Sequence, residues 1–452
     1  MSAWSPSSWK NKPSAHPADY APGPAFDGAI AKLADLPPLV TAWEIDQLKA
    51  LLADAQLGRR FVLQGGDCAE TVADCRESII TSKLKILLQM SLVLVHATRR
   101  PVVRIGRLAG QYAKPRSSPT ETKDGVTLPS YFGDLYNRPE FTADARKVDP
   151  ALLVSAYEHA ALTLNFVRAL VDHGFGDLHH PEYWDMSFLE RNELGDELRA
   201  QYTRASVELG EAIRFVEALG EKTVESFTRA EFFTSHEGLN LHYEAAQTRL
   251  DARADGPSRF YDFSTHLPWI GDRTRALGGA HVEFFRGIAN PVGIKAGPTM
   301  SPEDLRALGT ALNPNDEPGK LVVITRLGAG NVETYLPKLI GAMKDRRVLW
   351  VVDPMHGNTV KTQSGYKTRH VDEIFREIER SFAVHKTEGS WLGGIHFELT
   401  GENVTECLGS GIAEDDLSKN NATACDPRLN YTQSLELAFR LANQLRETFR
   451  TK

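Results

Sequence analysis

Four side chains that could bind a metal ion follow short apolar runs spread along the chain. Cys68 ends the run FVLQGGDC, His356 ends VLWVVDPMH, and Glu398 lies in GGIHFE. Asp426 lies in ACDPRLN, a loop after the last of these runs. One sulfur, one imidazole and two carboxylates suit a divalent transition metal, and the mixture does not single out zinc. The pattern predicts a metalloenzyme.

Each of these residues also has a structural interpretation when it is taken alone. A buried cysteine is usually a small hydrophobic residue, and a carboxylate after a strand often caps the next helix. The segment DPMHG favours the metal site, because Pro354 and Gly357 would form a tight turn that presents His356. Asp353 in the same segment is expected behind the ligands rather than among them.

A second group of side chains could bind anions. Arg107, Lys114 and Arg116 lie in RLAGQYAKPRS, directly after a predicted strand. Guanidinium groups suit bidentate contacts with carboxylate and phosphate. Three cations alone would indicate only a solvated basic loop, but others follow further predicted strands: Arg273, Lys295, Arg326 and Lys367. Their convergence on one mouth predicts a substrate with several negative charges, such as a phosphorylated carboxylic acid.

Strand-like and helix-like segments alternate along the chain and would position these side chains. Eight segments are predicted strands: 61–67, 102–107, 231–235, 260–264, 291–295, 321–326, 348–353 and 393–398. Helical patterns follow most of them: 77–98, 151–173, 240–253, 274–287, 302–311, 332–345, 370–384 and 432–448. Eight such units predict an α/β fold, a (β/α)8 TIM barrel whose ligands gather at the carboxyl ends of the strands. No nucleotide-binding glycine motif follows the first strand.

Segments outside the repeating units divide the chain further. We predict an N-terminal arm and helix at 1–56 and a catalytic barrel at 57–452. A helical insertion is expected at about 175–222, between strands 2 and 3, and favours a subunit or effector interface over surface decoration. The arm carries three aromatic residues that could dock against the body: Trp4, Trp9 and Tyr20.

Composition narrows the class of protein. A chain of 452 residues with 42% hydrophobic content can bury a large core. The net charge of −7 gives no electrostatic case for nucleic acid as a partner. Polar residues such as Lys83 and Lys85 interrupt the most apolar helical segment, so no membrane span is predicted. With no secretory signal and only four cysteines, we expect a cytoplasmic protein.

Nine motifs, in order, closely resemble the type II 3-deoxy-D-arabino-heptulosonate 7-phosphate (DAHP) synthases. They are GGDCAE, RLAGQYAKPRS, SHEGL, WIGDRTR, NPVGIKAGP, DPMHGNT, GYKTRH, GGIHFELTGENVTECLG and ACDPRLN. The resemblance runs nearly end to end and includes WSPSSWKNKP at the start. It implies the first step of the shikimate pathway, in aromatic amino acid biosynthesis. In that step phosphoenolpyruvate condenses with D-erythrose 4-phosphate and water, and phosphate is released.

The resemblance also implies roles for individual residues. It implies a bound metal ion, with Mn²⁺ or Co²⁺ expected, whose ligands are Cys68, His356, Glu398 and Asp426. It places phosphoenolpyruvate on Arg107, Lys114, Asp272, Arg273, Lys295 and Arg326. It places erythrose 4-phosphate on Arg116, Ser117 and Lys367. It gives catalytic roles to Lys114, Lys295 and Glu237. One departure is Asp272, where many relatives carry glutamate.

Several alternatives stay open at this point. The resemblance implies a homo-oligomer, a dimer or a tetramer, and the insertion implies an aromatic amino acid effector. Cys425 lies next to Asp426, so oxidation could join Cys68 to Cys425 and remove the thiolate ligand, or both could stay reduced in the cytosol. The rival functions are another metal-dependent barrel acting on phosphorylated sugars, and a catalytically silent barrel that binds aromatic metabolites or a partner enzyme.

Overall fold

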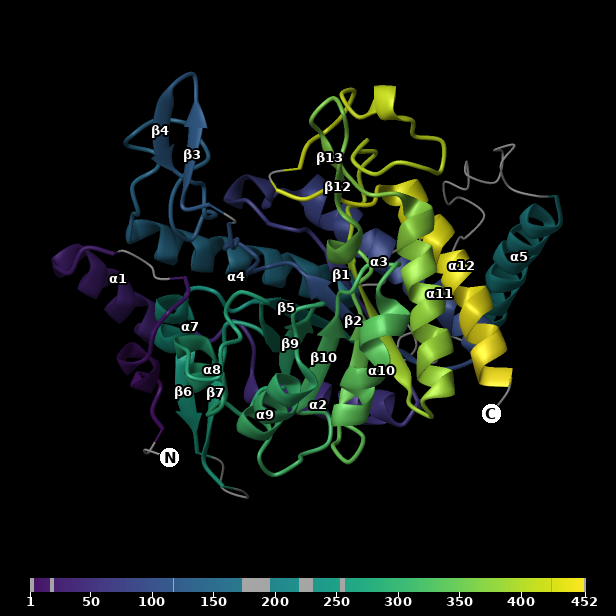
Figure 1. Ribbon diagram of the computed structural model, residues 1–452, viewed down its shortest axis with the longest axis horizontal. Coiled ribbons are helices and arrows are strands. Elements are labelled where there is room, and N and C mark those ends of the chain that lie inside the picture. Colours follow the sequence, from purple (N-terminus) through teal and green to yellow (C-terminus); the bar gives the residue numbers. More distant parts are fainter. Residues whose placement is uncertain are drawn as a thin grey trace.

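The apolar runs of the chain lie side by side as eight parallel strands that close into a barrel (Figure 1). The computed structural model describes residues 4–16, 20–116, 118–172, 196–218, 231–252, 257–423 and 425–450. The barrel strands are β1 (Phe61–Gly66), β2 (Val102–Arg107), β5 (Phe232–Glu237), β8 (Leu267–Ile270), β9 (Val292–Ala296), β10 (Leu321–Thr325), β11 (Leu349–Val352) and β14 (Leu392–Glu398). Their order around the barrel is β1-β14-β11-β10-β9-β8-β5-β2. The predicted (β/α)8 barrel is therefore confirmed.

One helix follows each barrel strand and covers the outside of the sheet. These helices are α3 (Glu77–Thr98), α4 (Ala151–Asp172), α7 (Leu241–Gln247), α8 (Ala280–Phe285), α9 (Pro302–Leu312), α10 (Val332–Ala342), α11 (Val371–Thr387) and α12 (Tyr431–Arg450). Helices cover one side of the strands and side chains fill the other, so strands such as β1, β9 and β14 are buried along their whole length.

The segment predicted as a strand at 260–264 does form one, but its predicted place in the barrel is wrong. Residues Arg259–Asp262 form β7, which pairs antiparallel with β6 (Thr248–Asp251) outside the barrel. The fourth barrel strand is instead β8, with the sequence LPWI, which pairs in parallel with β5 and β9. Aromatic residues make RFYDF the stronger strand pattern, whereas the four-residue β8 contains a proline that normally argues against a central strand. β6 also shortens the helix predicted at 240–253.

The single helix predicted within the N-terminal segment 1–56 is two helices. They are α1 (Pro24–Asp35) and α2 (Ala42–Gln56), separated by a break that contains Pro37 and Pro38. The inner face of α2 packs into one end of the barrel with Leu48, Leu52 and neighbours, against side chains from the first residues of the strands. This helix therefore closes the amino-terminal end of the barrel and leaves the opposite end as the mouth.

The aromatic residues of the N-terminal arm dock against the body, as their presence in the sequence suggested. Trp9 and Tyr20 are each only 8% exposed. The Trp4 Nε1 donates a hydrogen bond to the Glu283 carbonyl oxygen at 2.9 Å. Tyr20 donates to the Leu135 carbonyl oxygen at 2.9 Å. The described part of the arm is thus packed against the body through these aromatic residues.

The region between β2 and β5 carries the additional elements. A hairpin of β3 (Thr120–Lys123) and β4 (Val126–Pro129) stands out beside the mouth (Figure 1). Part of the predicted insertion forms α5 (Asp196–Ala218), which packs on α3 and α12, with the Tyr202 and Phe439 ring centroids 5.1 Å apart. The other residues of the predicted insertion, 175–195 and 219–222, lie outside the described residues.

Among the described helices, α3 alone has the length and apolar composition of a membrane span. Most of the helix is buried, because it packs against β1 and β2 on one side and α12 on the other. Lys83, one of the polar residues expected to interrupt it, is buried in an ion pair with Asp67, whereas Lys85 is only half-buried. α3 is therefore a core helix of the barrel.

We expect Leu94→Ala to destabilise the fold. Leu94 is fully buried in α3 within the main hydrophobic cluster, and such a truncation costs about 2–5 kcal/mol in the free energy of unfolding. Denaturant titration followed by circular dichroism measures the loss. The matched control is Leu162→Ala on α4, where the side chain is 60% exposed; equal losses in the two variants would contradict this account of the core.

Candidate active site

The strand ends bring charged side chains to one rim of the barrel. Arg107, Glu237 and Glu398 are the last residues of β2, β5 and β14. Arg326 and Asp353 follow β10 and β11 directly. Since all the barrel strands run parallel, these ends meet at the mouth opposite α2, where active sites of such barrels lie.

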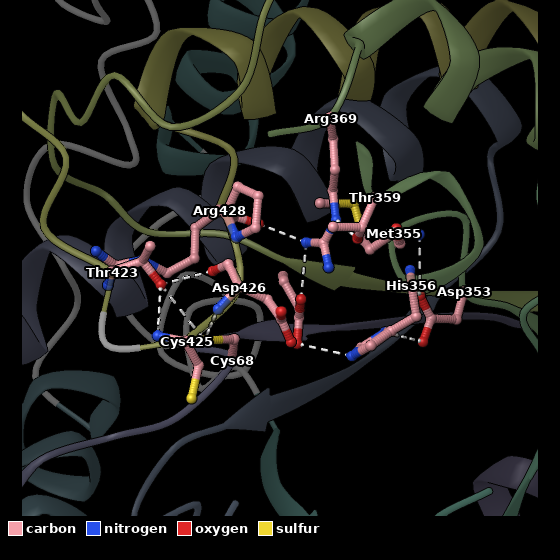
Figure 2. Close-up of polar contacts among 12 residues, drawn as sticks. Cys68, Asp353, Met355, His356, Thr359, Arg369, Thr423, Cys425, Asp426 and Arg428 are labelled. Atoms are coloured by element: carbon pink, nitrogen blue, oxygen red, sulfur yellow. Dashed lines mark hydrogen bonds and ion pairs between the residues drawn. The ribbon is translucent and has the colours of Figure 1, made fainter. Parts of the chain in front are cut away.

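Three of the four predicted metal ligands form one cluster. Ligand atoms of His356, Glu398 and Asp426 all lie within 4.8 Å of one another. Figure 2 shows His356 and Asp426 pointing into a shared space from different segments. Cys68 is adjacent: its sulfur accepts a hydrogen bond from the Asp426 backbone N–H at 3.3 Å. Imidazole, carboxylate and sulfur donors from four segments thus face one region.

The environment of Glu398 fits a bound cation. Within the described part of the chain, its two buried oxygens lack a hydrogen bond of good geometry. The oxygens lie 3.1 Å from Arg107 Nη2, 3.1 Å from His356 Nε2 and 2.7 Å from Arg369 Nη1. Burial alone would raise the pKa of Glu398, but these positive groups hold it well below its usual value. Glu398 is thus an ionised carboxylate with lone pairs available to a metal.

Asp353 fixes the orientation of the His356 ring. Its Oδ2 lies 2.7 Å from His356 Nδ1, which leaves Nε2 directed at Glu398. Asp353 also pairs with the Lys295 ammonium group. A carboxylate behind a histidine ligand sets its tautomer and raises its basicity. This agrees with the expectation that Asp353 lies behind the ligands.

Arg107 and Lys295 share one imidazole as their acceptor. Arg107 Nη1 lies 2.7 Å and Lys295 Nζ 3.1 Å from Nε2 of His396. Burial, with the two cations next, holds the pKa of His396 well below its usual value. Burial also lowers the pKa of Lys295 to about 8, despite the opposing charge of Asp353. The indole of Trp269 lies against both, 5.2 Å from the Arg107 guanidinium and 5.7 Å from the Lys295 nitrogen.

Asp426 connects the metal cluster to two more predicted cations. Its oxygens lie 2.9 Å from Lys114 Nζ and 3.3 Å from Lys367 Nζ. Burial would raise the pKa of Asp426, but Lys114 in particular holds it far below its usual value. Arg326 lies 3.5 Å from an Asp272 oxygen and donates to the His356 carbonyl oxygen at 3.3 Å.

Glu237 faces the same charged group. The positive charges of Lys114, Lys295, His356 and Arg107 act on it, yet burial dominates and raises its pKa. Its backbone N–H donates to Gln111 Oε1 at 3.1 Å. A carboxyl whose pKa is raised beside a cationic cluster is a candidate for proton transfer.

The other predicted residues lie at the edge of this cluster or outside the described residues. Arg273 is exposed in the loop after β8. Asp272 uses its side chain to contact Arg275 at 2.8 Å and Arg326. Arg116 Nη1 lies 3.3 Å from the Cys425 sulfur. Ser117 lies outside the described residues.

The sequence reasoning missed three residues of the site: His396, Arg369 and Arg428. Arg369 is fully buried and pairs with Glu398, and its Nε donates to Thr359 Oγ1 at 2.9 Å. Arg428 lies 2.8 Å from oxygens of both Asp67 and Glu406. Figure 2 shows the two arginines flanking the ligand cluster. A signal was present, since both arginines and His396 lie in motifs quoted for their neighbours.

All four cysteines, including Cys68 and Cys425, are free thiols in the described residues. The two side chains are close enough to form a hydrogen bond, which together with burial raises the pKa of Cys68 well above its usual value. Metal coordination would deprotonate the Cys68 sulfur. The disulfide between them stays a hypothesis, tested by counting thiols on oxidised, metal-free protein.

This chain is similar, over nearly its whole length, to one protein family and to several known proteins. Residues 4–442 match the profile of the Class-II DAHP synthetase family. A phospho-2-dehydro-3-deoxyheptonate aldolase of Neurospora crassa is 45% identical over 466 residues, 99% of this chain and 96% of that protein. The Streptomyces coelicolor protein of the same name is 46% identical over 443 residues, 97% of each chain.

Two further similarities are more limited. The Mycolicibacterium smegmatis phospho-2-dehydro-3-deoxyheptonate aldolase is 45% identical over 435 residues, 94% of this chain and 92% of that one. A solved structure of such an aldolase from Francisella tularensis SCHU S4 covers 93% of this chain and 96% of its own at 14% identity. Its TM-score of 0.47 makes that likeness too distant to bear on the site.

Asp353→Asn should weaken metal binding. The amide cannot hold both His356 and Lys295 as the carboxylate does, and loss of a partner behind a ligand typically costs about 10–100-fold in metal affinity. Titration of the stripped protein with Mn²⁺, followed by electron paramagnetic resonance of the free ion, measures the dissociation constant. Asp372→Asn, at an exposed carboxylate on α11, is the control and should match the parent protein; an unchanged constant in Asp353→Asn would contradict the role given to Asp353.

Proposed function

This chain belongs to the Class-II DAHP synthetase family, and we propose that the charged mouth of its barrel carries out the family reaction. The chain is a DAHP synthase, the enzyme of the first step of the shikimate pathway. The resemblance drawn from the nine motifs is thereby confirmed. The observation that carries the residue-level proposal is the contact of a His–Glu–Asp cluster with buried cations at one rim.

The family is metal-dependent, and we assign the metal to four side chains: Cys68, His356, Glu398 and Asp426. The ionised Glu398 and the oriented His356 support this assignment. Mn²⁺ or Co²⁺ suits a set of one sulfur, one nitrogen and two carboxylate donors. A metal bound there would supply Lewis-acid polarisation of the aldehyde oxygen of erythrose 4-phosphate.

Phosphoenolpyruvate is assigned to the cations beside the metal cluster. Arg107, Lys295 and Arg326 come from three different strand ends and would hold its carboxylate and phosphate. The remaining members of this proposed set are Lys114, Asp272 and Arg273. The exposed Arg273 would contact the substrate only in the mouth, whereas the Asp272 side chain acts by orienting Arg326. Holding both anionic groups fixes C3 toward the aldehyde.

Erythrose 4-phosphate is assigned to Arg116, Ser117 and Lys367. Lys367 reaches the Asp426 side of the cluster and is largely exposed, as a group that captures a phosphate from solvent should be. Arg116 approaches the same side through Cys425. These contacts support a phosphate site beside Asp426 and Cys425.

Lys114, Lys295 and Glu237 are proposed as the side chains that manage protons and charge. Attack by C3 leaves positive character at C2 of phosphoenolpyruvate, which water captures before phosphate departs. Burial raises the pKa of Glu237, which favours a role for this carboxyl in proton transfer. Lys114 is placed to protonate the new alkoxide, since it lies against Asp426 in the metal cluster.

The remaining assignments concern the setting of the enzyme. We propose a cytoplasmic homo-oligomer, a dimer or a tetramer, with no nucleic acid or membrane partner. We also propose an aromatic amino acid effector that acts through the insertion between β2 and β5. Native mass spectrometry with and without phenylalanine, tyrosine and tryptophan would test the assembly and the effector together.

Phosphate release tests the reaction directly. Metal-stripped protein should release phosphate only when phosphoenolpyruvate, erythrose 4-phosphate and added Mn²⁺ are all present. Addition of each aromatic amino acid in turn tests for inhibition. Release without erythrose 4-phosphate would indicate a hydrolase, and no release with any divalent metal would move the protein toward a silent regulatory barrel.

Arg107→Ala should sharply reduce the use of phosphoenolpyruvate while leaving the fold intact. The guanidinium is buried against Glu398 and His396, and loss of such a preorganised group costs about 10²–10³-fold in turnover. Steady-state kinetics with both substrates, together with circular dichroism, measures the effect. Arg59→Ala, whose side chain is 68% exposed, is the control, and unchanged kinetics in Arg107→Ala would refute its role.

A further inference from the structure

A carboxylate from an outer helix reaches two loops of the mouth at once. Glu377 lies in α11 and is only 1% exposed. Its Oε1 accepts the Leu327 backbone N–H at 2.9 Å, and its Oε2 accepts Asn358 Nδ2 at 2.7 Å. Leu327 directly follows Arg326 on the β10 loop, and Asn358 follows His356 by two residues on the β11 loop. One side chain therefore contacts the loops of a substrate cation and of a metal ligand.

These two loops touch backbone to backbone. A Cβ added to Gly328 would lie 2.7 Å from the Gly357 carbonyl oxygen, and Gly328 has a positive φ of 85° that L residues rarely adopt. Asn358 Oδ1 accepts the Ala329 N–H at 2.9 Å. Arg326 donates to the His356 carbonyl oxygen at 3.3 Å. A displacement of one loop would therefore displace the other.

Stability of the fold alone does not explain why a carboxylate, Glu377, is buried at this position. In the described part of the chain, no basic side chain forms an ion pair with Glu377. Burial raises its pKa to about 8, although the N–H groups of Leu327 and Gly328 oppose the rise. Burying an acid without a cation is costly, and an apolar residue often serves a core as well or better. The three groups that donate hydrogen bonds to Glu377 are the Leu327 and Gly328 N–H groups and the Asn358 amide, and all three belong to the mouth loops. The carboxylate therefore serves to hold these loops.

We propose that Glu377 is a positioning residue that couples the phosphoenolpyruvate cation Arg326 to the metal ligand His356. Its two oxygens hold the β10 and β11 loops in register, so that metal binding and phosphoenolpyruvate binding depend on the same contact. The inference rests on the proposed function, which assigns those roles to Arg326 and His356. Of the two erythrose 4-phosphate cations of the described residues, Arg116 follows β2 and lies on neither loop. Lys367 lies in β13 (Lys367–Thr368), further along the same β11–α11 connection, where its partner is Asp426 rather than Glu377.

Glu377→Gln is the direct test, because the amide keeps the shape but turns one acceptor into a donor. We expect the Mn²⁺ dissociation constant and the KM for phosphoenolpyruvate each to rise about 10-fold, with the KM for erythrose 4-phosphate unchanged. The melting temperature should not fall. Glu379→Gln, an exposed glutamate on the same helix, is the matched control and should leave all four values unchanged.

Asn358→Ala provides a second, independent variant and carries the test if Glu377→Gln does not fold. It should raise the same two constants. If the pair acts as one unit, Glu377→Gln/Asn358→Ala should cost no more than the larger single change. Additive effects, or a rise in all three constants in step with a lower melting temperature, would overturn the coupling.

Two reference variants separate this inference from the function beneath it. Arg326→Ala should raise the KM for phosphoenolpyruvate, and His356→Ala should raise the Mn²⁺ dissociation constant. If neither does, the proposed site is wrong and the coupling falls with it. If both do while Glu377→Gln matches Glu379→Gln, the site stands and the coupling alone is overturned.

Discussion

The mouth of this barrel depends on the neutralisation of one buried carboxylate, Glu398. Arg107, Arg369 and His356 converge on it from three different segments. Neighbouring carboxylates are neutralised in the same way: Asp426 pairs with Lys114, and Asp353 pairs with Lys295. Charges of both signs can be buried together because each has a partner at contact distance. A bound metal and anionic substrates would fit into this arrangement by replacing partners rather than by creating an uncompensated charge.

The local pattern of the sequence was enough to predict the barrel but not all of its strands. Seven of the eight predicted strand segments overlap barrel strands because continuous apolar runs with turn residues between them are typical of a parallel sheet. The fourth strand was misplaced because LPWI gains its place from pairing with β5 and β9, which no local pattern encodes. The segment RFYDF has the stronger local strand pattern, but it contributes β7 to a hairpin outside the barrel.

The sequence indicated which residue types form the site, but not which of those side chains contact one another. The motifs identified the ligand and cation candidates, and the family assignment that they supported is confirmed. They did not reveal that His396 lies between Arg107 and Lys295, or that Arg369 supports Glu398, because those contacts join residues far apart in the chain. Glu377 was hidden for the same reason, since its helical position resembles that of any core-facing residue.

The barrel can close only late in synthesis, because its first strand pairs with its last. β1 pairs with β2 on one side and with β14 on the other, so one edge stays unpaired until residues Leu392–Glu398 have been made. At synthesis rates of about 5–20 residues per second, that interval is roughly 20–70 s. An open parallel edge invites pairing with other chains. The nascent protein must therefore rely on covering helices, or on chaperones, until its last strand has been made.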